Sequence, residues 1–235
     1  MSRQSDYTKN ISYQVYLSLK DKIITIDYKP GDVLKELDIA EEFKLSRTPI
    51  RAAIQELKNE GFVEFNNKNI VTPMSLNDYI KIFQIRENLE LLSVKLATLN
   101  WNEENILALE ENCQLQKKSL YKKGYQPLKF LNLDRQFHLS MAKISGNNFL
   151  VEELKRFYDL FYRYNYICGF ENRKDYAIVE HENLISMIKN GNMGLAMKQM
   201  KDHMTNVNSL IIMSLPEKLS KLSTLPKNND SKHIV

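Results

Sequence analysis

The segment KLSRTPIRAAIQELKNEGFV, residues 44–63, decides how the N-terminal part of this chain folds. Its apolar residues recur at intervals of three and four, which is the period of a helix that buries one face. These positions are Ile50, Ala53, Ile54 and Leu57. Ser46 stands where its hydroxyl can accept a hydrogen bond from the first turn, and Pro49 has no amide hydrogen to leave unpaired there. We therefore predict a helix that is capped by Ser46 and stops at Gly61.

The residues on either side of this helix predict two more helices and a hairpin. Residues 11–26 repeat apolar side chains with helical spacing, and residues 37–43 make a short second helix. The runs 62–65 and 69–72 are β-prone and are separated by asparagines that tolerate positive φ, which favours a hairpin. Helix, helix, turn, helix and hairpin is the order of a winged helix-turn-helix, whose recognition helix enters the major groove of DNA. We therefore expect residues 1–75 to form such a DNA-binding domain.

The third predicted helix carries side chains that suit recognition of double-stranded DNA. Arg47 and Arg51 lie one turn apart and share a face, where each guanidinium could donate two parallel hydrogen bonds to guanine O6 and N7. Thr48 could reach a phosphate or a thymine methyl group. The candidate DNA-binding residues are Lys44, Ser46, Arg47, Thr48 and Arg51, with Lys68 at the hairpin tip. A solvated helix that binds nothing is the alternative, because residues 1–75 hold eleven basic and eleven acidic side chains.

From residue 76 onward the chain has no strand pattern and repeats the helical period. Breaks rich in glycine and asparagine separate six segments. The predicted helices span residues 76–99, 103–123, 127–144, 147–168, 173–190 and 192–213. We therefore assign residues 76–215 to an all-α helical bundle and the whole chain to the mainly α class. Helical order is expected to stop at Pro216, which leaves residues 216–235 as a mobile tail.

Composition limits the classes to which this protein can belong. The formal net charge is only +4, so overall charge indicates no particular partner. Cys113 and Cys168 lie far apart and without a CxxC spacing, which argues against a disulfide framework and a cysteine zinc site. No apolar run is long enough to span a bilayer, and the polar N-terminus is unlike a signal peptide. We therefore expect a cytoplasmic protein with no membrane partner.

Three of the four histidines fall within apolar stripes of the predicted bundle helices. His138, His181 and His203 should therefore face the core, and Asp134 lies one turn before His138 on the same face. Three inward imidazoles and one carboxylate, drawn from three helices, are what a metal site inside a bundle requires. This set suits a divalent ion such as Zn²⁺ or Ni²⁺ and leaves coordination positions open. The alternative is that each histidine is an ordinary core residue bonded to a carbonyl, with Asp134 paired to His138.

Two groups of motifs resemble one family of transcription regulators. The segment KPGDVLKELDIAEEFKLSRTPIRAAIQELKNEGFVE, residues 29–64, is similar to the DNA-binding domain of the GntR family. The wing departs from the family pattern, because a glycine and a basic residue are usual at its tip and this chain has Lys68 and asparagines. Further along, IRENLELLSVKLA, DRQFH, EHENLISMIKNGN and MKDHM resemble the FCD effector domain of the FadR-type branch. The count of six helices resembles the shorter, VanR-like form of that domain.

The resemblance implies a ligand-responsive repressor that binds a palindromic operator as a homodimer. Many members hold a divalent metal with an Asp, a His four residues later and two further His on later helices. The matching positions here are Asp134, His138, His181 and His203. An arginine at the position of Arg86 can face the ligand pocket and would bind the second oxygen of a small carboxylate effector. A surface pairing of Arg86 with Glu90 is the alternative.

Two other functions stay open at this point. A site of three histidines and one aspartate could activate water in a metal-dependent enzyme fused to a DNA-binding domain. No general base is evident, however, because the sequence around Glu180 and Glu182 gives these carboxylates no special role. The metal could also be purely structural, in which case its removal would melt the bundle and no small molecule would stabilise the protein further.

Overall fold

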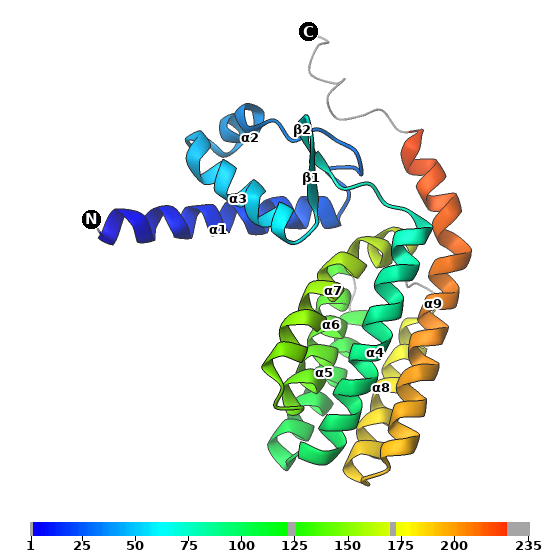
Figure 1. The fold of residues 1–235 in the computed structure, drawn as a ribbon. Coiled ribbons are helices and arrows are strands. Elements are labelled where there is room, and N and C mark those ends of the chain that lie inside the picture. The colour runs from blue at the N-terminus through cyan, green and yellow to red at the C-terminus, as the bar shows by residue number, and fades with distance from the viewer. Residues whose placement is uncertain (1, 122–125, 170–172, 225–235) are drawn as a thin grey trace. The chain divides into compact units, whose positions relative to one another are not determined.

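The computed structural model describes residues 2–121, 126–169 and 173–224. The chain divides into two compact units. One comprises the residues up to Ser75 together with the chain from Glu217 onward, and the other comprises Leu76–Pro216. Figure 1 labels the helices and strands of both units. Of the helices in the described ranges, none has the length and apolar character needed to cross a bilayer.

Three helices and a hairpin build the N-terminal unit, in the predicted order. Helix α1 spans Ser2–Ile24, α2 spans Glu36–Phe43 and α3 spans Arg47–Asn59. Helix α3 packs against both α1 and α2 through its apolar stripe. The buried members of this stripe are Pro49, Ile50, Ala53, Ile54 and Leu57. Ser46 is the N-cap residue of α3, but its side chain makes no cap hydrogen bond, so that part of the prediction was wrong.

The wing is an antiparallel hairpin of β1, Val63–Asn66, and β2, Lys68–Val71. Asn67 forms the tip and adopts a φ of 58°, in the left-handed region that glycine usually occupies. Asparagine enters this region more readily than other side chains because its short amide can hydrogen-bond locally. The tip therefore turns tightly without a glycine. An isolated antiparallel β-bridge also pairs Val33 with Ile70 of the hairpin. The sequence did not reveal this pairing.

Six helices build the second unit within the residues that the structure describes. They are α4 (Leu76–Asn100), α5 (Glu103–Tyr121), α6 (Pro127–Ile144), α7 (Asn148–Cys168), α8 (Lys174–Lys189) and α9 (Met193–Ser223). Helix α6 packs against α4, α5 and α7, and α8 packs against α5 and α4. Because α6 has neighbours on several sides, it buries consecutive side chains from Phe137 to Leu139. His138, the middle residue of this run, is therefore enclosed by the bundle.

Helix α9 overturns one expectation about the C-terminal part of the chain. It continues through Pro216 and ends at Ser223, whereas the loss of helical order was predicted at that proline. Proline removes one helical hydrogen bond and commonly ends or kinks a helix. Here Leu215, the residue before it, is fully buried, and packing of this kind overrides the local preference. The rest of the predicted tail, residues 225–235, lies outside the described residues.

Candidate functional site

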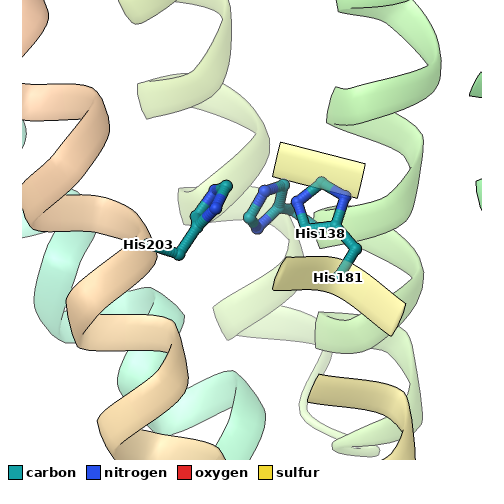
Figure 2. A group of neighbouring side chains, drawn as sticks. All are labelled: His138, His181 and His203. Carbon is teal, nitrogen blue, oxygen red and sulfur yellow. The ribbon is translucent and has the colours of Figure 1, made fainter. Parts of the chain in front are cut away.

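Three histidines from three helices meet inside the bundle. His138 lies on α6, His181 on α8 and His203 on α9, and their rings gather in one place (Figure 2). One ring nitrogen from each histidine lies within 4.8 Å of those of the other two. All three side chains are buried, with exposed fractions of 0%, 1% and 3%. Such a spacing suits three ligands of a single ion.

Asp134 lies one turn before His138 on α6 and borders the same cluster. Its Oδ1 atom is 3.8 Å from Nε2 of His181 and 4.0 Å from Nε2 of His138. These distances are too long for hydrogen bonds, so Asp134 does not simply pair with His138. The carboxylate instead faces the Nε2 atoms of two rings at once. All four residues of the expected ligand set therefore lie in one part of the core.

The ring of His138 is oriented by a buried carboxylate. Nδ1 of His138 lies 3.0 Å from Oε2 of Glu90, and Nη2 of Arg86 lies 3.4 Å from the other oxygen of Glu90. Burial disfavours the charged form of Glu90, but attraction to His138 and Arg86 outweighs it and lowers the pKa of Glu90 to about 2. An ionised carboxylate only accepts hydrogen bonds, so His138 donates to it through Nδ1, and Nε2 is the nitrogen that would bind a metal.

The ring of His203 is oriented in the same way by a second carboxylate. Nδ1 of His203 lies 2.7 Å from Oε2 of Glu180. Arg173 donates to both oxygens of Glu180, at 2.5 and 2.6 Å, and Asn206 donates to Oε1 at 3.0 Å. Glu180 thus has a defined role that its sequence neighbours did not indicate. A carboxylate behind a histidine, itself held by hydrogen bonds, is the usual support of a metal-binding imidazole.

Among the described residues no carboxylate bonds His181, and ring packing holds it. Its ring stacks on Phe137, with the centroids 4.0 Å apart and the planes 15° from parallel. Burial lowers the pKa of His181, and the nearby His203 and His138 add to this effect, so its ring is neutral near pH 7. Within the described residues, both nitrogens of His181 and Nε2 of His138 lack a hydrogen-bond partner. Buried nitrogens without partners are costly, and a metal ion would bind Nε2 of His138 and one nitrogen of His181, so these residues fit a divalent cation.

Arg86 extends this network away from the histidines. Its guanidinium lies between the rings of Tyr158 and Phe161, with its carbon 4.1 and 3.9 Å from their centroids. Nη2 donates to the Tyr158 hydroxyl at 2.6 Å, while Nε and Nη1 have no partner among the described residues. Arg86 does pair with Glu90, but inside the core and not on the surface. Both residues interrupt the buried stripe of α4, which is the signal by which Glu90 could have been found.

A hollow lies elsewhere on the bundle, away from the histidines. It has a volume of about 910 Å³ and lies between α5 and α8, where Leu107, Cys113 and Ile185 are among its lining residues. None of the three histidines lines it. The hollow and the histidine cluster are therefore separate features. We regard the cluster as the better candidate site because it gathers side chains that can bind a metal.

The candidate DNA-binding residues lie on the open face of the other unit. All six are exposed: Lys44, Ser46, Arg47, Thr48, Arg51 and Lys68. The two arginines at the start of α3 both bond the carboxylate of Glu36 on α2. A recognition helix with an exposed, cationic N-terminal end is the arrangement that enters a major groove.

Family models match both units of this chain. The model of bacterial regulatory proteins of the gntR family matches residues 11–69, and the FCD domain model matches residues 81–206. The chain belongs to the GntR family and carries an FCD domain. The winged helix-turn-helix and the bundle described above are therefore the DNA-binding and FCD domains of one regulator.

Several GntR-type relatives are similar along most of this chain. The uncharacterized HTH-type transcriptional regulator YdhC of Bacillus subtilis is 28% identical over 194 residues, or 81% of this chain and 86% of the relative. The Uxu operon regulator of Haemophilus influenzae is 29% identical over 211 residues, or 80% of this chain and 77% of the relative. The transcriptional repressor GlaR of Escherichia coli is 26% identical over 163 residues, or 65% and 71% of the two chains.

Solved structures share the fold at lower sequence identity. Escherichia coli McbR/YncC superimposes with a TM-score of 0.75 at 20% identity, covering 87% of this chain and 98% of that one. A GntR regulator from Rhodococcus sp. RHA1 gives a TM-score of 0.72 at 19% identity, covering 86% and 98%. The family and these relatives are transcription regulators, so this chain is a DNA-binding transcriptional regulator of GntR/FCD type and not an enzyme.

Proposed function

We propose that the chain is a repressor whose operator binding is controlled by a small carboxylate bound at a divalent metal site in the FCD domain. The observation that carries this proposal is the convergence of buried nitrogens without partners. Nε2 of His138 and both nitrogens of His181 lack hydrogen bonds within the described residues, next to Asp134 and His203. An ordinary core histidine satisfies its ring nitrogens with hydrogen bonds, whereas His181 has none here and His138 uses only Nδ1.

The donor set favours Zn²⁺ or Ni²⁺. Asp134, His138, His181 and His203 supply three imidazoles and one carboxylate, which suit borderline ions better than Mg²⁺ or Ca²⁺. A bound ion would supply positive charge and open coordination positions for the oxygens of a carboxylate. The four side chains would hold the ion, and Glu90 and Glu180 would fix the orientation of the His138 and His203 rings.

Arg86 is the residue that we expect to bind the effector's second oxygen. It is a permanent cation inside the bundle, and its Nε and Nη1 atoms have no partner among the described residues. Glu90 links it to His138, so the cation lies one residue away from the proposed ligand set. A carboxylate that bridges the ion and this guanidinium would therefore gain two charged contacts.

Repression, dimer formation and location belong to the same proposal. Two relatives from Escherichia coli are named repressors, GlaR and RspR.

Ile85, Leu92 and Leu99 are exposed at seven-residue intervals along α4, and an apolar stripe of this kind favours pairing with a second copy. A two-fold dimer would bind a palindromic operator. Because such an operator lies on the chromosome, the regulator would act in the cytoplasm.

A thermal shift screen of small carboxylates tests the effector site. Metal-loaded and chelator-treated protein would be heated with the same panel of sugar acids and central metabolites. A carboxylate that raises the Tm only in the metal-loaded sample supports the proposal. A panel with no metal-dependent hit contradicts it. If the panel gives no hit and the chelator still lowers the Tm, the metal has the purely structural role considered above.

DNA recognition is tested separately from the effector site. The full chain would be titrated onto a duplex from its own promoter and onto a random duplex of equal length, at several salt concentrations. We expect tighter binding to the promoter and a steep loss of affinity with salt, because lysine and arginine contacts release counterions. Equal affinities for the two duplexes would contradict control of its own promoter.

A further inference from the structure

One carboxylate links the two arginines that start the recognition helix. Glu36, the first residue of α2, accepts from Nη2 of Arg47 at 3.0 Å through Oε2. The same oxygen accepts from Nη2 of Arg51 at 3.0 Å, and Oε1 accepts from Nε of Arg51 at 3.2 Å. The two guanidinium groups are therefore held together by a single acceptor on a neighbouring helix.

The exposure of the three side chains differs in a way that matters for DNA. Arg47 and Arg51 are 60% and 68% exposed, whereas Glu36 is only 17% exposed behind them. Glu36 is therefore less exposed to solvent than either arginine that it bonds. The hydrogen bonds from Arg51 and then from Arg47 hold the pKa of Glu36 below its usual range, against the opposing effect of burial, so the link persists at neutral pH.

The contacts leave the base-reading edges available. A guanidinium has five N–H groups, of which Arg51 uses two for Glu36 and Arg47 uses one. On Arg51 the edge made by Nε and Nη2 is occupied, while Nη1 and the second hydrogen of Nη2 form an end-on fork that bonds no residue in the described part of the chain. A fork of this type can bond guanine O6 and N7 with two parallel hydrogen bonds.

We propose that Glu36 is a positioning residue for DNA reading, which fixes Arg47 and Arg51 and so contributes sequence specificity at the expense of general affinity. An unrestrained arginine loses side-chain rotamer entropy when it binds a base in one geometry. Two free guanidinium groups one turn apart also repel each other. Glu36 removes both obstacles before DNA arrives, yet its negative charge weakens attraction to phosphates.

The test compares Glu36→Ala with the wild-type full chain on two kinds of DNA. The probes are a duplex that the wild-type chain selects from a random pool and an unselected duplex of equal length. We expect the ratio of the two affinities to fall about tenfold or more in Glu36→Ala, because a well-positioned bidentate contact discriminates at that level. Affinity for the unselected duplex should rise, with a salt dependence steeper by about one unit in the log–log slope.

Glu41→Ala is the matched control, because Glu41 is exposed on the same helix and the arginines bond Glu36 instead. It removes the same charge and should leave the affinity ratio unchanged. Equal tightening on both duplexes in Glu36→Ala would overturn the proposal, since Glu36 would then only compete with DNA. If Glu36→Ala lowers the Tm, the same measurements are made on Glu36→Gln, which keeps one acceptor oxygen. For the proposal to stand, Glu36→Gln must give a lower ratio of selected to unselected duplex affinity than the wild type.

Discussion

Replacing Glu180 with glutamine should weaken metal binding without removing any ligand. Arg173 and Asn206 both donate to Oε1 of Glu180, so the amide oxygen of a glutamine would take that position. The amide NH₂ would then replace Oε2, which now accepts from Nδ1 of His203. Because an NH₂ group can only donate, His203 would have to move its proton to Nε2, the nitrogen that a metal needs.

The size of this effect follows from the role of such supporting residues. Loss of a carboxylate behind a metal-binding histidine weakens binding by about 10- to 100-fold, which is about 1.4 to 2.7 kcal/mol. At free metal 100 times the wild-type Kd, binding stabilises the folded protein by about 2.7 kcal/mol. In Glu180→Gln that stabilisation should fall to about 1.4 kcal/mol or to about 0.4 kcal/mol, and the metal-dependent rise in Tm should shrink by roughly 3 to 9 °C.

The assay is a competitive titration of metal-free protein with Zn²⁺ and a coloured chelator, followed by thermal unfolding with and without the ion. Glu182→Gln is the control, because Glu182 lies on the other side of His181 in sequence and instead bonds Lys117 at 2.6 Å near the surface. It should bind Zn²⁺ like the wild type. Equal Zn²⁺ affinity of Glu180→Gln and Glu182→Gln would refute the role assigned to Glu180.

Three other predictions concern different parts of the molecule. His138→Ala should lose metal and the response to effector while keeping its basal affinity for operator DNA, because the two sites lie in separate units; a large loss of DNA affinity in a binding assay would contradict this. Burial raises the pKa of Cys113 to about 12, so in a Cys168→Ser background its thiol should stay unreactive toward a disulfide reagent at pH 9 until the protein unfolds. Rapid labelling of folded protein would show that the thiol is accessible. Asn67→Ala should destabilise the DNA-binding unit by about 1 kcal/mol in chemical denaturation, because alanine disfavours the positive φ of the wing tip, whereas Asn67→Gly should be close to neutral.

The sequence predicted the elements whose burial pattern is local. The stripe of α3 identified that helix, the asparagines identified the hairpin, and the interruption of apolar stripes by His138, His181 and His203 indicated that these residues face the core. Each of these signals depends only on residues within one element. The spacing of residues within an element was therefore enough to predict that element and its buried face.

The contacts between elements could not be read in this way. Glu180 lies next to His181 in sequence but bonds His203 on another helix, and that pairing depends on how α8 and α9 pack. The link from Glu36 to Arg51 likewise joins α2 to α3 across 15 positions of the chain. The continuation of α9 through Pro216 reflects burial of Leu215, which overrides the local preference of proline. Packing between elements determines these two bonds and the length of α9. The sequence of a single element therefore does not predict them.

The pairing of each supporting carboxylate with an arginine has a consequence for the charge that the site can accept. Glu90 is balanced by Arg86 and Glu180 by Arg173, so both supports are electrically neutral as pairs. With neutral imidazoles, the formal charge of the centre is then set by Asp134 and a divalent ion together, which leaves one positive charge. A single carboxylate would cancel that charge in the dry core, where an unbalanced charge is expensive to bury. Without the ion, Asp134 would repel the same anion and the charge of Arg86 would already be balanced by Glu90, so the anion should bind only when the ion is bound.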